Sequence, residues 1–253
     1  MDYGEREILR GCEGPDVVEL QLRLAGFRGT LPDGQFGPGT ERQVMSFQRD
    51  YMKLANPSGR ADGATLRAID DFAGRFPFDF DRLRCPCGEC SGFGSGRNRG
   101  VYRAGQPKVE ACHLYEYPGM HRLLLWAVRA LFFYLPGHGF TISSGYRCGI
   151  DNAAHGRSST NHHGKAIDID IAPRAGECRA DDLKKCDEVR GCIVYTADAQ
   201  VGWGAPNRKA LEPRDLAPTW VHYDVRSYEP RYLSEEMFCT DLAGLDRRRL
   251  IRC

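Results

Sequence analysis

The sequence lacks the long apolar runs, basic clusters and charge imbalance that mark several common classes of protein. Its longest apolar candidate, Leu123 to Leu135, is shorter than the roughly 20 residues that span a bilayer and is interrupted by Arg129. Thirty-five Lys and Arg residues against 34 Asp and Glu residues leave a formal net charge of +1. No basic run of about 5–8 residues occurs. We therefore expect neither a nucleic-acid partner nor insertion into a membrane.

The cysteines, by contrast, are numerous. There are eleven, an odd number that is high for a cytosolic protein, and ten of them lie from Cys85 onward. Three form the tight group CPCGEC, at Cys85, Cys87 and Cys90. Thiolates at this spacing are typical of a zinc knuckle, but a second CxxC or HxxxH pair is not evident downstream. We therefore favour disulfides or buried thiols here, and the pairing stays open.

The length and the 42% hydrophobic content suffice for two domains of ordinary size. Periodic apolar residues in GPDVVELQLRLAGF predict a first helix, Thr40 can cap a second that carries Phe47, and a third starts at Asp62 or Thr65. Three short helices joined by glycine-rich turns make a module of about 60 residues, which is near the lower limit for folding alone.

These segments resemble a known repeat. GPDVVELQLRLAGF, DGQFGPGTERQVMSFQ and GRADGATLRAI are similar to the peptidoglycan-binding repeat of cell-wall hydrolases, over roughly residues 10–70. The resemblance implies a groove for the glycopeptide of the wall. We place a peptidoglycan-binding domain at residues 1–75, a linker and entry segment at 76–107, and a second domain at 108–253.

The second domain contains two segments in which apolar and polar residues alternate as in strands. Lys165 to Ala172 places Asp168 and Asp170 on one face, and Pro218 to Arg226 places His222 and Asp224 on one face. The loop SSTNHHG before the first segment adds two histidines. Two histidines and one carboxylate are a common catalytic zinc shell, in which the fourth position holds water. The pattern therefore predicts a zinc site.

The motifs SGYR, NAA, HHGKAID and WVHYDV resemble the M15 family of zinc peptidases, over roughly residues 108–230. That family cleaves peptide bonds that involve D-amino acids in peptidoglycan, as D-Ala-D-Ala carboxypeptidases or as endolysin-type endopeptidases. The resemblance implies an α+β protein: a small three-helix peptidoglycan-binding domain followed by a hedgehog/VanX-like α+β zinc peptidase domain.

The register of the metal site leaves two alternatives. The family motif places a histidine seven positions before the ligand aspartate, but counting from Asp168 this position is Asn161. We favour His162 with Asp168, because a loop absorbs a deletion more easily than a strand changes register. The alternative is His163 with Asp170. The third ligand is His222 in both schemes.

The catalytic groups are less regular. Where many relatives have a glutamate three residues before the last histidine, this chain has Thr219. We expect Asp224 either to accept a proton from the zinc-bound water or to orient a ligand, with Glu212 and Asp215 as substitutes. Arg147 matches the arginine of the SGYR motif and is expected to hold a substrate carboxylate or polarise the scissile carbonyl.

Three aromatic residues are expected to bind substrate along the cleft: Tyr146, Trp203 and Trp220.

The resemblances together imply a zinc-dependent peptidoglycan hydrolase that cleaves the stem peptide or cross-link. The alternative is a catalytically inactive peptidoglycan-binding protein with a structural zinc site. The first residues, MDYGEREILRGCEG, lack the features of a secretory signal. We therefore expect action at the cell wall or periplasm after release by lysis, as for an endolysin, or after delivery by a secretion machine, as for an antibacterial toxin with an immunity protein.

Overall fold

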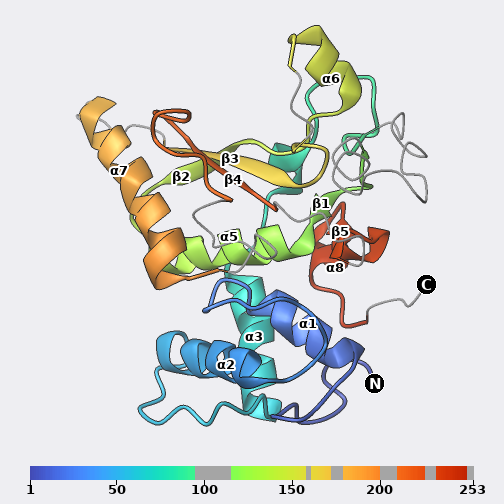
Figure 1. Cartoon of the computed structure of the whole chain (residues 1–253), viewed down its shortest axis with the longest axis vertical. Helices are drawn as coiled ribbons and strands as arrows, with labels where there is room; N and C mark the ends of the chain where they lie inside the picture. The colour runs from blue at the N-terminus through green and yellow to red at the C-terminus, as the bar shows by residue number, and fades with distance from the viewer. Residues whose placement is uncertain (95–114, 158–160, 172–178, 200–209, 226–231, 250–253) are drawn as a thin grey trace.

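The structure is a computed structural model of the chain and describes residues 1–94, 115–157, 161–171, 179–199, 210–225 and 232–249. It is a mixed α and β protein in which three N-terminal helices gather at one end and a small sheet lies beyond helix α5 (Figure 1). The expected α+β class is confirmed. Among the described residues, no helix has the length and apolar character needed to cross a membrane.

The N-terminal domain consists of α1 (Pro15–Arg23), α2 (Pro38–Asp50) and α3 (Gly63–Arg75). Helix α3 begins as predicted, because the Asp62 side chain accepts a hydrogen bond from the Thr65 N–H at 2.8 Å. The prediction that Thr40 caps the second helix is wrong. The N-cap is Gly37, three residues earlier, and the buried Thr40 hydroxyl accepts a hydrogen bond from the Gln21 amide at 2.9 Å.

An aromatic cluster joins this domain to the rest of the chain. Within the domain, Phe27 packs edge-on against Phe47 and Phe72, with ring centroids 5.0 and 5.3 Å apart. Helix α5 (Arg122–Tyr134) adds Phe133, which is 6.3 Å from Phe72, and Trp126, which is 6.4 Å from the same ring. The two parts of the molecule therefore share one apolar core.

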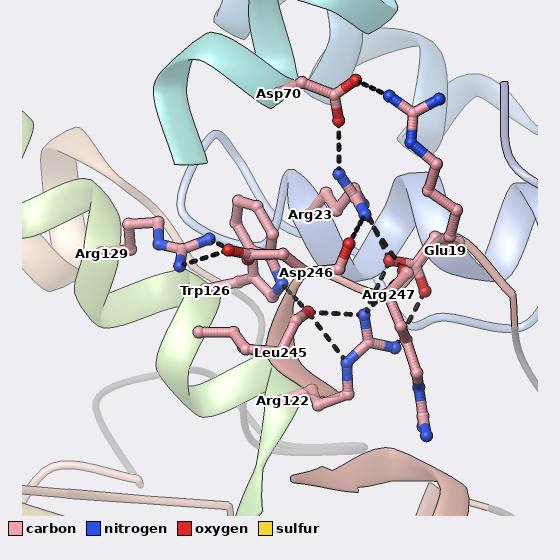
Figure 2. A network of polar contacts seen from close by, with 10 residues as sticks. Glu19, Arg23, Asp70, Arg122, Trp126, Arg129, Leu245, Asp246 and Arg247 are labelled. Carbon is pink, nitrogen blue, oxygen red and sulfur yellow. Dashed lines mark hydrogen bonds and ion pairs between the residues drawn. The ribbon is translucent and has the colours of Figure 1, made fainter. Parts of the chain in front are cut away.

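A buried ionic network reinforces this contact (Figure 2). Glu19 of α1 is fully buried and accepts hydrogen bonds from Arg122 of α5 at 2.7 and 2.8 Å and from Arg23 at 2.7 Å. Arg122 also donates to the Leu245 carbonyl, so the C-terminal helix α8 (Leu242–Leu245) joins the same cluster. Separating the two domains would leave the charges of Glu19 and Arg122 without their partners, which is energetically costly for buried groups. We therefore expect this network to hold the two domains in one relative orientation.

The second domain is built around a three-stranded antiparallel sheet in the order β2, β3, β4, with bounds Phe140–Ser144, Ala166–Ile171 and Val221–Asp224. Helix α5 lies between this sheet and the N-terminal helices, and α7 (Arg179–Gly191) lies at one end of the sheet (Figure 1). On β3, Ile167 and Ile169 are fully buried in the core. Because side chains alternate along a strand, Asp168 and Asp170 lie on the opposite face.

Shorter elements complete the domain. Strands β1 (Met120–His121) and β5 (Phe238–Cys239) pair antiparallel, and α6 (Gly149–Ala154) follows the loop after β2. A π-helical turn (Cys192–Thr196) extends α7, and 3-10 turns occupy Phe80–Leu83 and Glu235–Met237.

Two glycines are required by close backbone contacts. A Cβ atom at Gly145 would lie 2.6 Å from the Leu83 carbonyl oxygen, so residues 80–83 approach the sheet only because this position lacks a side chain. Gly164, just before β3, has a φ of +93° and would place a Cβ 2.3 Å from the Gly119 carbonyl oxygen. Both glycines lie on the segments that lead to the candidate site.

Candidate metal centre

Strand pairing brings the first two site residues together. In the β3–β4 register Asp168 lies directly opposite His222, and residues directly opposite each other on antiparallel strands project to the same face. The His222 Nδ1 atom is 2.7 Å from Asp168 Oδ1. Both side chains are largely buried, with residue exposures of 5% and 7%. The predicted strand alternation therefore produces the expected His and Asp pair.

The third residue comes from the loop before β3. His162 Nδ1 lies 2.6 Å from the Gly145 carbonyl oxygen, and a carbonyl accepts, so this nitrogen carries the hydrogen and Nε2 holds the free lone pair. His162 Nε2 is buried, has no hydrogen-bond partner, and lies 3.4 Å from Asp168 Oδ1. A buried acceptor without a donor, aimed at a carboxylate, is the arrangement that a metal ion would complete.

One nitrogen or oxygen from each of His162, Asp168 and His222 lies within 4.8 Å of the others, which makes them one of two candidate metal groups in the described residues. Two imidazole nitrogens and a carboxylate oxygen suit zinc, whose catalytic sites have three protein ligands. The residues present therefore fit the implied metal.

A second carboxylate, that of Asp224, contacts the outer nitrogen of the His222 ring. Asp224 is 1% exposed and lies 3.0 Å from His222 Nε2, on the side of the ring opposite to Asp168. The Asn161 side-chain amide donates to Asp224 at 3.3 Å. Burial would lower the pKa of His222, but the hydrogen bonds to Asp168 and Asp224 raise it to about 9. Burial would raise the pKa of Asp168, but its contacts with the two histidines hold it well below its ordinary value.

An open cavity of about 430 Å³ leads to the site. It is lined mostly by polar side chains: Ser143, Ser144, Arg147, Arg157, His162, Asp168, Asp170, Glu212, Thr219, Trp220 and His222. Arg147 forms an ion pair with Asp168, and its Nε donates to the Ser144 hydroxyl at 2.8 Å. The cavity thus places the three candidate ligands, a cation and an aromatic ring against one solvent-accessible space.

The other predicted residues divide between the cavity and the core. Trp220 and Thr219 line the cavity, whereas Tyr146 is fully buried and its hydroxyl donates to the Tyr117 carbonyl at 2.9 Å. His163 is also buried and lies 3.3 Å from the Asn152 side-chain amide. Trp203 lies outside the described residues.

Among the acidic residues, Asp170 and Glu212 line the cavity, and Asp215 is exposed. The backbone N–H of Glu212 donates to the His222 carbonyl at 3.2 Å, and Leu211 pairs with Tyr223. Glu212 therefore runs beside β4 next to a candidate ligand. No local pattern in the sequence signals this placement, since residue 211 forms only an isolated bridge and no regular strand.

The comparisons with known proteins cover both parts of the chain. Residues 13–69 match the family model described as "Putative peptidoglycan binding domain". The first domain is a peptidoglycan-binding domain. The chain is also similar to the zinc D-Ala-D-Ala carboxypeptidase of Streptomyces albus G, with 29% identity over 169 residues. The aligned region covers 63% of this chain and 59% of that protein, so the match spans about three fifths of the relative's length.

These findings confirm the combination that the motifs indicated. The peptidoglycan-binding domain lies in the region of the three N-terminal helices, and about three fifths of the chain is similar to a zinc carboxypeptidase. The similarity to a zinc enzyme agrees with the donor set formed by His162, Asp168 and His222.

Proposed function

We propose that the protein is a zinc-dependent peptidoglycan hydrolase that cleaves a peptide bond of the stem peptide or the cross-link. The observation that carries the proposal is the convergence of His162 Nε2, Asp168 Oδ1 and His222 Nδ1 on one face of the sheet, at the base of an open cavity. These atoms would hold the metal. When bound, zinc lowers the pKa of a coordinated water toward neutrality and polarises the scissile carbonyl.

Asp224 is proposed to orient His222 and not to meet the substrate. It is bonded to the far nitrogen of the His222 ring and is 1% exposed, so it favours the tautomer in which Nδ1 is free to bind a metal. Of the two roles expected from the sequence, its contacts favour the positioning one.

Glu212 is the carboxylate that we propose as proton acceptor. It lines the cavity, and its pairing with His222 across the backbone places both side chains on the same side of β4. A carboxylate at the cavity wall can take a proton from a water near the ligands and return it to the leaving amine. This role would substitute for the glutamate that the family motif has at Thr219.

Arg147 is proposed to bind the substrate. Its guanidinium lines the cavity and forms an ion pair with Asp168. A metal held by Asp168 would neutralise part of its negative charge, and the Arg147 guanidinium would then be available to pair with a carboxylate or a carbonyl of the peptide. Trp220, on the same wall, is proposed to contact the substrate side chains.

The peptidoglycan-binding domain is proposed to tether the enzyme to its substrate. Tethering raises the effective concentration of wall peptide at the cavity without new contacts there. Action at the wall fits either an endolysin released by lysis or an antibacterial effector delivered by a secretion machine, and an immunity protein would be the partner only of the effector. We propose the domain bounds 1–75 and 108–253 for the two units.

Digestion of purified peptidoglycan tests the proposal. We expect the zinc-loaded protein to release new amino groups, and His162→Ala and Asp168→Ala to release none above background. His155→Ala is the matched control, because His155 directly follows α6 as its C-cap, has a side chain about half exposed, and is absent from the cavity lining. Loss of activity in His163→Ala and Asp170→Ala with retention in His162→Ala would instead support the other register.

A further inference from the structure

The second group of metal-binding side chains in the described residues contains only cysteines. The Sγ atoms of Cys85, Cys87, Cys90 and Cys148 all lie within 4.8 Å of one another. Three of them belong to the short turn CPCGEC. The fourth lies far away in the sequence, immediately after Arg147, and its Sγ is 3.6 Å from that of Cys87. The fold thus supplies the fourth thiol that the local sequence lacks.

Backbone N–H groups point at every one of these sulfurs. The Cys87 sulfur accepts from the N–H groups of residues 89 and 90 at 3.4 and 3.3 Å, and the Cys90 sulfur accepts from residue 92 at 3.3 Å. The Cys85 sulfur accepts from residue 148 at 3.4 Å, and the Cys148 sulfur accepts from residue 151 at 3.4 Å. Hydrogen bonds of this kind stabilise the negatively charged form of an acceptor. The cluster is therefore arranged to hold thiolates.

The spacing suits a tetrahedral ion. Zinc binds thiolate at about 2.3 Å, which places sulfurs at the corners of a tetrahedron about 3.8 Å apart. The 3.6 Å between Cys87 and Cys148 is close to this edge. Cys85 and Cys148 are buried while Cys87 and Cys90 are partly exposed, so an ion would be enclosed by protein and still reachable from solvent.

We propose that Cys85, Cys87, Cys90 and Cys148 bind a second zinc ion as four thiolates. Four protein ligands leave no open position, so this site is structural and takes no part in hydrolysis. It does not depend on the function proposed for the first site.

The second site would fix the loop that carries Arg147. Cys148 follows Arg147 directly, and the Tyr146 N–H donates to the Leu83 carbonyl at 2.8 Å, next to Cys85. Phe93, at the other end of the cysteine turn, packs edge-on against Tyr146 with ring centroids 5.9 Å apart. The ion would therefore fasten residues 83–93 to the loop between β2 and α6. Arg147 would then keep its place beside Asp168 through a metal that lies outside the cavity.

Metal analysis of the full-length protein tests the proposal. We expect two zinc ions per chain in the wild type and one in His162→Ala/His222→Ala, whose remaining zinc must be held by the cysteines. Cys87→Ser/Cys90→Ser is expected to lose one zinc ion, whereas the control Cys12→Ser, which removes another partly exposed thiol, keeps two. No zinc in the double histidine variant, an unchanged zinc content in Cys87→Ser/Cys90→Ser, or iron in place of zinc would overturn the proposal.

Two further measurements need no cysteine variant, so they remain informative even if the cysteine variants do not fold. Cobalt loaded into His162→Ala/His222→Ala is expected to give strong thiolate-to-cobalt charge-transfer absorption, since only sulfur ligands produce it. Alkylation of the denatured, chelated wild type without reductant is expected to label Cys85, Cys87, Cys90 and Cys148. Absence of the absorption, or a peptide mass that shows disulfides among the four, would refute the site.

Discussion

Replacing Glu19 with glutamine should destabilise the protein far more than the same change at the surface. Glu19 is fully buried and contacts both Arg23 and Arg122 at 2.7–2.8 Å (Figure 2). Glutamine keeps the shape but leaves two buried guanidinium groups without their common anion. Breaking a buried pair in this way costs about 3–5 kcal/mol. The matched control is Glu7→Gln, because Glu7 and Arg60 are also 2.8 Å apart but have side chains 37% and 55% exposed. The control should cost less than about 1 kcal/mol.

The effect should depend on pH with a defined sign. Burial would raise the pKa of Glu19, but Arg122 and Arg23 hold it below its ordinary value. The stability from this charge is therefore fully present above the unfolded pKa of about 4.3 and is lost as the pH falls through the folded pKa. Urea unfolding of the wild type and of Glu19→Gln should be measured at pH 7 and at pH 3.5. The difference between their free energies of unfolding should be smaller at pH 3.5. A difference below about 1 kcal/mol at pH 7, or a difference that is no smaller at pH 3.5, would refute the reasoning.

Three further changes test the site and its support. Gly145→Ala should lower the free energy of unfolding by about 1–3 kcal/mol in thermal melts, because its Cβ would lie 2.6 Å from a backbone oxygen, whereas Gly137→Ala has no atom within 4 Å and should be neutral. Glu212→Gln should lower kcat on a wall peptide about 100-fold or more with zinc content unchanged, and an unchanged kcat would remove it as the proton acceptor. Asp224→Asn should weaken zinc binding about 10- to 100-fold in a chelator competition, and unaltered affinity would contradict its orienting role.

Local patterns in the sequence predicted much of the fold. The cap at Asp62 follows from the chemistry of one helix terminus. Strand alternation assigns Asp168 to one face of β3 and His222 to one face of β4, so these features could be predicted without long-range information. The peptidoglycan-binding motifs likewise lie within one continuous segment, which the family match at residues 13–69 confirms.

The contacts between distant segments could not be predicted in this way. Glu19 and Arg122 are 103 residues apart, and no periodicity indicates that each is the other's partner. The same holds for Cys148, which joins a turn more than 50 residues earlier, and for Glu212, which runs beside β4 from an irregular segment. The sequence also does not distinguish an aromatic residue of the cleft from one of the core: Tyr146 was expected at the substrate and lies in the core.

Mass spectrometry of muropeptides tests the central claim most directly. Purified peptidoglycan is incubated with the full-length protein after zinc loading and after removal of metal by a chelator. The account predicts products shortened or separated at a peptide bond only with the zinc-loaded protein, and restoration of these products when zinc is returned to the stripped protein. Wall that binds the zinc-loaded protein but releases no cleaved peptide would contradict the account and support a peptidoglycan-binding protein without hydrolytic activity.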